Sequence, residues 1–329
     1  MMFWDMGANG FRAVFQADAL GLWIMLTGSL VAAACALVGV FLVLRRMSML
    51  GDAISHSVLP GIALAFILTG SRHVVPMLIG AAALGILTAF LTDVLNRQGK
   101  LQNDAAIGVT FTWLFAIGVI LISRYAGHVD LDLDCVLYGE ILYAPFDTWT
   151  LWGANMGPRA VWMMGFATVA NLLFIVLGWK QLKLCTFDAG LAASLGFSVA
   201  VWHYLLMGFV SLTTVAAFES VGAILVVAML IVPANTAYLL TDRLWLMTLL
   251  AVLTGVLSAI VGYGFAAAID ASIAGAMATV SGVFFVLTAF LSPKHGILIK
   301  WLRRNNWRNH AELPGDMKTH AEKKVIART

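Results

Sequence analysis

The stretch VLRRMSMLGDAISHSVLPGIAL, residues 43–64, decides the fold because it joins two apolar runs through one basic turn. The two runs cover residues 20–44 and 53–70. Each is long enough to cross the hydrocarbon core of a bilayer, which takes about 20 residues as a helix. Arg45 and Arg46 lie between them, as basic residues do in loops on the cytoplasmic side. The stretch therefore predicts two consecutive membrane helices joined at that side.

The composition extends this prediction to the rest of the chain. Hydrophobic residues make up 61% of the 329 and charged residues only 11%, whereas a soluble domain is about 25% charged. Because an open sheet cannot pair its backbone in lipid, the spans must be helices. We therefore expect an all-α, polytopic membrane bundle of about nine helices, or eight with a re-entrant segment. The further apolar runs cover residues 74–95, 105–122, 160–178, 199–217, 221–240, 245–266 and 272–291.

The positions of the basic residues predict the orientation of the chain. They fall in alternate loops, and acidic residues gather in 129–140. Basic loops usually face the cytoplasm, so we expect the C-terminus inside and, with nine spans, the N-terminus outside. Three regions follow: an interfacial segment 1–18, a transmembrane domain 19–292, and a basic, partly disordered cytoplasmic tail 293–329. The basic loop residues are Arg45, Arg46, Arg97, Lys100, Lys180, Lys183 and Arg243.

Several kinds of chemistry are missing from the sequence. No G-x-x-x-x-G-K-[ST] run is present, so the chain does not itself hold ATP in a P-loop. H-E-x-x-H and G-x-S-x-G are absent too, and the cysteines, Cys35, Cys135 and Cys185, lack the C-x-x-C spacing of a zinc site. We expect no enzyme activity, no permanently bound cofactor and no nucleic-acid partner, and any ATP energy must come from another subunit.

Asp52 and His56 are the candidate site. At i and i+4 of a helix their Cβ atoms lie about 5–6 Å apart on one face, and an unpaired carboxylate in lipid costs a few kcal/mol. Pro60 cannot donate to the carbonyl of His56, and Gly61 adds freedom, so the helix is loosened there. A carboxylate with an imidazole suits manganese, iron(II) or zinc better than copper(I). The alternative is an Asp–His hydrogen bond at a helix–helix contact.

The quoted stretch resembles the signature of the permease subunits of ABC importers for manganese, zinc and iron. TFDAGLAASLGFS (186–198) resembles their cytoplasmic coupling segment, and LDLDCVLYGEIL (131–142) resembles an outer segment. ESVGAILVVAMLIVPANTAYLLTDRL (219–244) resembles their penultimate core. DASIAGAMATVSGVFFVLTAFLSPKHG (270–296) resembles their closing span, with Ser272 where many members carry proline. The likeness covers about residues 15–298.

This resemblance implies the permease fold shared with cobalamin and siderophore importers, in the bacterial cytoplasmic membrane. The partners would be two cytoplasmic ATP-binding subunits, a second permease, identical or paralogous, and an extracytoplasmic metal-binding protein. Asp52 and His56 would line the path and contact the transported manganese, zinc or iron ion. If two such chains met on a two-fold axis, two carboxylates and two imidazoles would surround one ion.

Other residues receive less specific roles. Asp188 at a helix start and Gly196 at its end suit a short coupling helix, carrying Leu191 and Leu195, that seats in an ATPase groove. Glu219 and Asp270 fall near the predicted outer surface, where they gate the ion, dock the binding protein, or simply end helices. Pro233 would kink its helix.

A second class of function remains open at this point. An ion-coupled secondary transporter or a channel could use Asp52 and His56 as a proton or cation relay. Such a protein would act without an ATPase, so co-purification of an ATP-binding subunit distinguishes the two classes. A third class, an intramembrane enzyme, would need a nucleophile or a fuller metal-ligand set than the sequence offers.

Overall fold

A computed structural model describes residues 19–70, 74–125, 141–151 and 154–292. Within them, nine helical segments are long and apolar enough to cross a membrane, so the predicted helical membrane bundle is confirmed. The interfacial segment 1–18 and the tail 293–329 lie outside the described residues. Eight spans are the helices α2 (Ala19–Leu44), α5 (Val74–Arg97), α6 (Asn103–Tyr125), α8 (Arg159–Leu177), α11 (Val199–Val221), α12 (Ala223–Leu240), α13 (Leu244–Ile269) and α14 (Ile273–Leu291).

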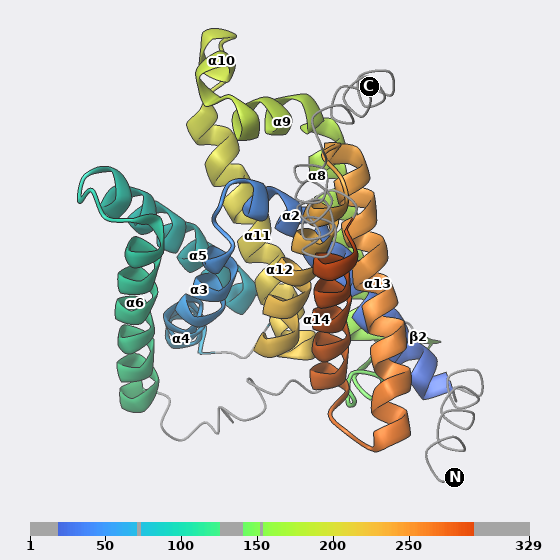
Figure 1. The fold of residues 1–329 in the computed structure, drawn as a ribbon. Coiled ribbons are helices and arrows are strands. Elements are labelled where there is room, and N and C mark those ends of the chain that lie inside the picture. The colour runs from blue at the N-terminus through green and yellow to red at the C-terminus, as the bar shows by residue number, and fades with distance from the viewer. Residues whose placement is uncertain (1–18, 71–73, 126–140, 152–153, 293–329) are drawn as a thin grey trace, which may run out of the picture.

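The ninth span is divided into two helices, α3 (Met49–Ser57) and α4 (Leu59–Thr69). Two short helices outside the spans, α9 (Trp179–Phe187) and α10 (Ala189–Ser194), lie beyond α8 at the upper end of Figure 1. A small hairpin of β1 (Thr148–Leu151) and β2 (Ala154–Pro158) precedes α8. The all-helical prediction missed this hairpin, whose antiparallel strands pair with each other and so need no larger sheet.

The centre of the bundle is α2, which packs against α8, α11, α12 and α13. It carries no charged residue, and Val31, Ala32, Ala34 and Cys35 are fully buried. At Gly39 a Cβ would collide with the carbonyl oxygen of Leu230 in α12. Small residues let helix backbones approach each other in lipid, where packing rather than hydrophobicity drives association. The core is therefore built on a close α2–α12 contact.

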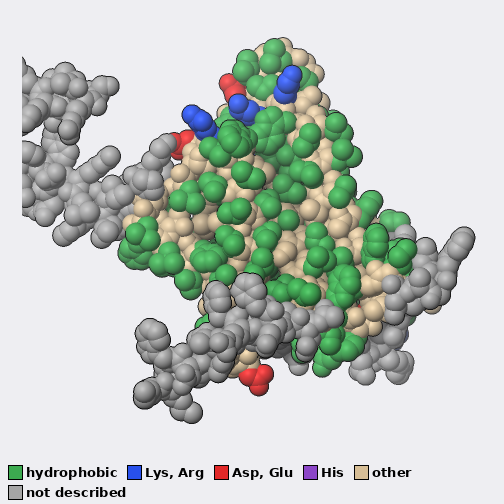
Figure 2. All heavy atoms as spheres, turned by 90° about the vertical axis from the view of Figure 1, so that its right-hand side faces the viewer, with side chains coloured by type: hydrophobic (Ala, Val, Ile, Leu, Met, Phe, Trp, Pro, Cys, Tyr) green, Lys and Arg blue, Asp and Glu red, His purple; other side chains and the backbone are tan. Residues whose placement is uncertain are grey.

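A second layer, made of α3, α4, α5 and α6, stands to one side of this core (Figure 1). Helix α4 packs between α5 and α6, α3 packs against α6, and α5 packs against α11. The flank shown in Figure 2 is covered by apolar side chains, with Lys and Arg gathered at one end. Residues such as Leu68, Phe166 and Leu177 are more than 70% exposed, which suits lipid as the surrounding solvent.

The polar loops converge at one end of the bundle, which we call the basic end. Arg45, in the linker between α2 and α3, donates to Thr186 of α9. The carbonyl of Arg46 accepts from Asn103 at the start of α6. Lys180 and Lys183 lie on α9 itself. Loops that were expected to share the cytoplasmic side therefore lie together in space, while the α13–α14 turn lies at the opposite end (Figure 1).

Candidate functional site

The divided span positions the candidate site. The N–H of Val58 donates to the carbonyl of Ile54 at 3.1 Å, and the N–H groups of Gly61 and Ile62 both donate to the carbonyl of Val58, at 2.9 and 3.1 Å. Pro60, in the first turn of α4, has no N–H to continue the ladder. Val58 keeps right-handed helical angles, φ −67° and ψ −28°, so the interruption is confined to one residue. Discontinuous helices of this kind commonly form ion sites in transporters.

Close backbone contacts hold the interruption in place. A Cβ at Gly118 of α6 would lie 2.8 Å from the Cδ atom of Pro60, and one at Gly80 of α5 would lie 2.6 Å from the carbonyl oxygen of Gly61. Cβ atoms do not approach other atoms so closely, so only glycine fits either position without a shift of the chain. Helices α5 and α6 thus clamp the start of α4 from two directions.

One face of α3 is fixed in the bundle. Leu50, Ala53 and Ile54 are buried, and the hydroxyl of Ser57 accepts from the Thr88 hydroxyl of α5 at 2.7 Å. Asp52 and His56 lie on another face of α3, and the imidazole of His56 contacts α6. The i,i+4 spacing therefore places both side chains on one face, and packing of the apolar residues leaves that face accessible.

The separation of Asp52 and His56 suits a bridging ion better than a direct hydrogen bond. Oδ1 of Asp52 lies 3.6 Å from Nε2 of His56, beyond the range of a good hydrogen bond. Two ligand atoms about 2.1 Å from one tetrahedral metal ion are about 3.4 Å apart. The two atoms could therefore reach one cation with little rearrangement.

The pair is more accessible than the sequence analysis assumed. We expected the pair to be buried, but the side chains of His56 and Asp52 are 36% and 42% exposed on the single chain, respectively. The spacing of two residues fixes their shared face, but only the packing of distant helices decides what covers that face.

Two phenylalanines of α6 enclose the imidazole of His56. The ring centroids of Phe111 and Phe115 lie 6.0 and 5.9 Å from that of His56, with interplanar angles of 34° and 84°. They are four residues apart, so they form one apolar wall on the face of α6. The sequence analysis did not select them, although a Phe pair at this spacing within a span was the available signal. They restrict the orientation of the imidazole.

The described residues offer only part of a metal coordination sphere. Within the described ranges, no three His, Cys, Asp or Glu side chains come together as a metal site. Asp52 and His56 could therefore provide two ligands, whereas a tetrahedral ion takes four. Any further ligands would have to come from groups other than these side chains of the described residues.

The predicted coupling residues lie at the basic end. Oδ1 of Asp188 accepts from the N–H of Leu191 at 2.9 Å, which caps α10. Gly196 follows the helix with φ +83°, a conformation that glycine adopts freely. Leu191 and Leu195 are 47% and 58% exposed, so α10 presents apolar side chains on a short helix that projects beyond the bundle (Figure 1).

The remaining predicted residues do not join the Asp52–His56 pair. Asp270 is exposed and ends α13 with a left-handed φ of 53°, at the end opposite α10. Glu219 belongs to the last turn of α11 at the same opposite end, but its side chain lies outside the described residues. Pro233 is buried within α12, which is continuous from Ala223 to Leu240.

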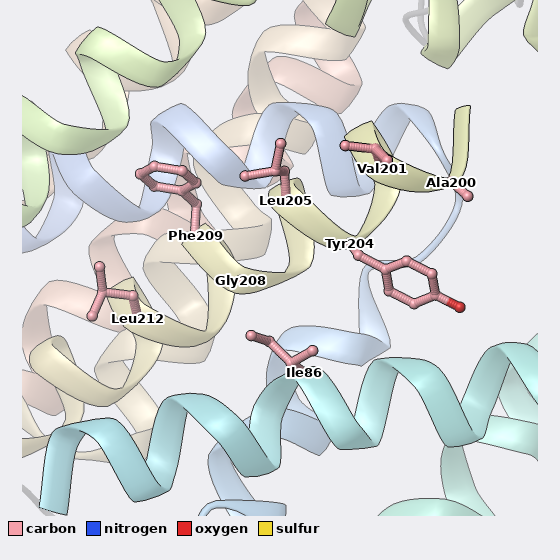
Figure 3. A pocket seen from close by; sticks show the side chains of 8 residues that line it. All are labelled: Ile86, Ala200, Val201, Tyr204, Leu205, Gly208, Phe209 and Leu212. Carbon is pink, nitrogen blue, oxygen red and sulfur yellow. The ribbon is translucent and has the colours of Figure 1, made fainter. Parts of the chain in front are cut away.

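An apolar groove of about 500 Å³ lies between α5 and α11 (Figure 3). Ile86 lines it from α5, and Leu205 and Phe209 line it from α11. Tyr204 forms the polar edge of the groove, and the Tyr204 hydroxyl donates to Oδ2 of Asp93 at 3.2 Å. The lining offers almost no ligand atoms for a cation.

The bundle of long apolar helices, one of them divided, has the architecture of a polytopic membrane protein. The model of the ABC 3 transport family matches residues 18–292, and the chain belongs to that family. The predicted likeness to permease subunits of metal ABC importers is confirmed by this match and by the relatives described next.

Two curated relatives and one solved structure are similar over most of their length. The manganese transport system membrane protein MntD of Bacillus subtilis (strain 168) is 52% identical over 284 residues, covering 86% of this chain and 96% of that protein. The zinc transport system membrane protein TroD of Treponema pallidum (strain Nichols) is 47% identical over 279 residues, 85% of this chain and 76% of that protein. PsaBC from Streptococcus pneumoniae, solved in complex with Fab, superposes with a TM-score of 0.71 at 33% identity, covering 88% of this chain and 97% of that one.

Proposed function

We propose that this permease carries a divalent transition-metal ion, Mn²⁺, Zn²⁺ or Fe²⁺, across the bacterial cytoplasmic membrane, driven by ATP hydrolysis on partner subunits. The observation that carries the proposal is the 3.6 Å separation of Oδ1 of Asp52 from Nε2 of His56, on a helix that is interrupted two residues later. The names of MntD and TroD, a manganese and a zinc transport protein, support the same class of cargo.

Asp52 and His56 would act on the ion as transient ligands. The carboxylate supplies charge, and the imidazole supplies a neutral nitrogen that several first-row ions accept. An exchangeable site must also release its cargo, and a pair of ligands on one helix can separate when that helix moves. Because this donor pair does not discriminate strongly between Mn²⁺, Zn²⁺ and Fe²⁺, selection among them would rest on the delivering protein.

A second permease, identical or paralogous, would complete the coordination. Two observations support this assembly: the face that carries Asp52 and His56 is exposed, and no third His, Cys, Asp or Glu side chain joins the pair among the described residues. Two aspartates would then balance the double charge of the ion, and two histidines would bring the number of ligands to four. The same assembly would remove the pair from lipid.

The other partners would bind at the two ends of the bundle. At the basic end, α10 with exposed Leu191 and Leu195 would seat in a cytoplasmic ATP-binding subunit, one for each permease. An extracytoplasmic metal-binding protein would dock at the opposite end, near Asp270 and Glu219. In this proposal the C-terminus would lie in the cytoplasm.

The test uses cells that carry the intact transporter with Asp52→Ala or His56→Ala in this chain. Both variants should reduce metal accumulation to background, because each removes a ligand, while membrane insertion and co-purification of the ATP-binding subunit stay normal. Elemental analysis under separate manganese, zinc and iron limitation gives the readout. Asp104→Ala, which removes an exposed acid at the start of α6, is the matched control.

Two results would overturn the proposal in different ways. Normal accumulation of all three metals in both variants would exclude the proposed role of the pair. Metal uptake by a preparation that contains no ATP-binding subunit would favour the ion-coupled transporter or channel, in which Asp52 and His56 relay protons or cations.

A further inference from the structure

Arg45 joins three segments that are far apart in the sequence. It lies in the linker between α2 and α3, seven residues before Asp52. Its Nε donates to Oγ1 of Thr186 in α9 at 3.2 Å, and its Nη1 lies 3.3 Å from Nδ1 of His203 in α11. Thr186 is two residues before Asp188, the cap of α10. One side chain therefore connects the linker that leads into the metal-site helix with the segment that carries α10.

The contact between Arg45 and His203 determines the state of the imidazole. A guanidinium has only donors, so Nδ1 of His203 must accept and the proton of the neutral ring must sit on Nε2. That Nε2 atom is buried with no hydrogen-bond partner among the described residues. Protonation of both nitrogens would replace the hydrogen bond with a repulsion between two cations. The bond therefore exists only while His203 is neutral.

Among the described residues, little compensates the charge of Arg45. Burial lowers the pKa of its guanidinium, and the nearby Cys185 opposes this shift. No carboxylate in the described segments lies within ion-pair distance of Arg45, and its Nη2 is buried without a hydrogen-bond partner there. A partly buried charge without a counter-ion is unfavourable. A site that keeps such a residue at the junction of three elements calls for a functional reason.

The same linker is tied to α6 as well. The carbonyl of Arg46 accepts from Nδ2 of Asn103 at 3.3 Å, and Oδ1 of Asn103 accepts from Asn96 of α5 at 3.4 Å. Helix α6 carries Phe111 and Phe115, which enclose the imidazole of His56. Movement of the linker would therefore reach both walls of the candidate ion site, α3 through the chain and α6 through Asn103.

We propose that Arg45 is the positioning residue that transmits movement of the α9–α10 segment to the Asp52–His56 helix. The inference rests on the proposed function, because it needs an ATP-binding subunit acting on α10. The two contacts of 3.2 and 3.3 Å are at the long end for hydrogen bonds, so they can break and re-form as α9 moves. Arg45 acts on the ion through α3 and through the bond between its linker and Asn103 of α6, without contacting the ion.

The test measures manganese uptake and phosphate release in the same vesicles, with the complete transporter and manganese-loaded binding protein. Arg45→Gln should lower the number of ions carried per ATP hydrolysed by about tenfold, since coupling between two sites typically amounts to about 5–150-fold. The ATP-binding subunits should co-purify as in the wild type. Arg46→Gln removes the same charge from the same linker, where the side chain has no polar contact in the described part of the chain, and should leave the ratio unchanged.

Rescue and partner variants separate transmission from folding. Arg45→Lys and His203→Gln each keep one polar group at the junction, so the number of ions carried per ATP hydrolysed should lie between the values of the wild type and Arg45→Gln. His203→Phe and Thr186→Val remove a partner of Arg45 and should lower this number below the wild-type value. A wild-type number of ions per ATP hydrolysed in Arg45→Gln would overturn the inference. The inference would also fail if Arg45→Gln lost the ATP-binding subunits to the same extent as it lost uptake. If Arg45→Gln does not fold, unchanged ratios in both His203→Phe and Thr186→Val would overturn it. A wild-type complex that carries no manganese, zinc or iron would instead refute the proposed function, and the inference with it.

Discussion

Gly61 and Gly80 bring α4 and α5 into backbone contact, with the Cβ position of Gly80 only 2.6 Å from the carbonyl oxygen of Gly61. This contact lies beside the interruption at Val58 that follows His56. The position of α4, which directly follows the helix of Asp52 and His56, therefore depends on two residues that have no side chain.

Gly80→Val should destabilise the protein by about 1–3 kcal/mol, because overpacking forces a backbone shift. The measurement is the midpoint of thermal unfolding in detergent, by intrinsic fluorescence. Gly108→Ala is the control, since a Cβ at Gly108 in α6 meets nothing within 4 Å and alanine favours a helix by about 0.5–1 kcal/mol. Equal midpoints for Gly80→Val and the wild type would show that α4 and α5 do not approach this closely.

Substitutions of Asp188 should separate the capping role from the charge. Asp188→Asn keeps an N-cap acceptor and should retain association with the ATP-binding subunit. Asp188→Ala removes the bond to the Leu191 N–H and should cost about 1 kcal/mol of local helix stability. Asp188→Lys removes the cap and reverses the charge, so we expect the weakest association. Co-purification from membranes at defined ionic strength gives the ranking, and equal recovery of all three variants would contradict it.

Phe111→Ala and Phe115→Ala should weaken handling of the ion without removing a ligand. Each ring restricts the His56 imidazole, and an aromatic contact is worth about 0.5–1.5 kcal/mol. The manganese concentration for half-maximal uptake should rise by roughly 2–10-fold. Trp113→Ala is the control on the same helix, because Trp113 is 60% exposed and faces the lipid side. An unchanged half-maximal concentration in both variants would show that the rings do not orient the imidazole.

The orientation of the bundle predicts which turns react from outside the cell. In a chain without Cys35, Cys135 and Cys185, we expect Ala271→Cys in the α13–α14 turn to react with a membrane-impermeant maleimide on intact cells. Gln98→Cys in the α5–α6 turn, at the basic end, should react only after permeabilisation. Both positions are exposed. The reverse pattern would place the basic end outside and contradict the proposed direction of ATPase docking.

The spans could be predicted from the sequence because each apolar run is a local property of consecutive residues. The run at 199–217 lies within α11, Val199–Val221, and the run at 272–291 differs from α14, Ile273–Leu291, by one residue. The cap at Asp188 was also a local signal, since it depends on a hydrogen bond to a residue three positions later.

The parts that could not be predicted depend on contacts between distant residues. The bonds from Arg45 reach Thr186 and His203, which are 141 and 158 positions away. The exposure of Asp52 and His56 likewise follows from how α3 packs against α5 and α6. Hydropathy gives the number and length of helices, but it does not give their rotation or their neighbours.

The charge-free helix α2 has a consequence for how the protein is made. Among the described spans it is synthesised first, yet α11, α12 and α13, which later cover it, follow only from Val199 onward. During translation, lipid has to occupy the places of these helices. A helix that is apolar on every side is equally soluble in acyl chains and among other helices. The first span can therefore wait in the bilayer until the chain is complete.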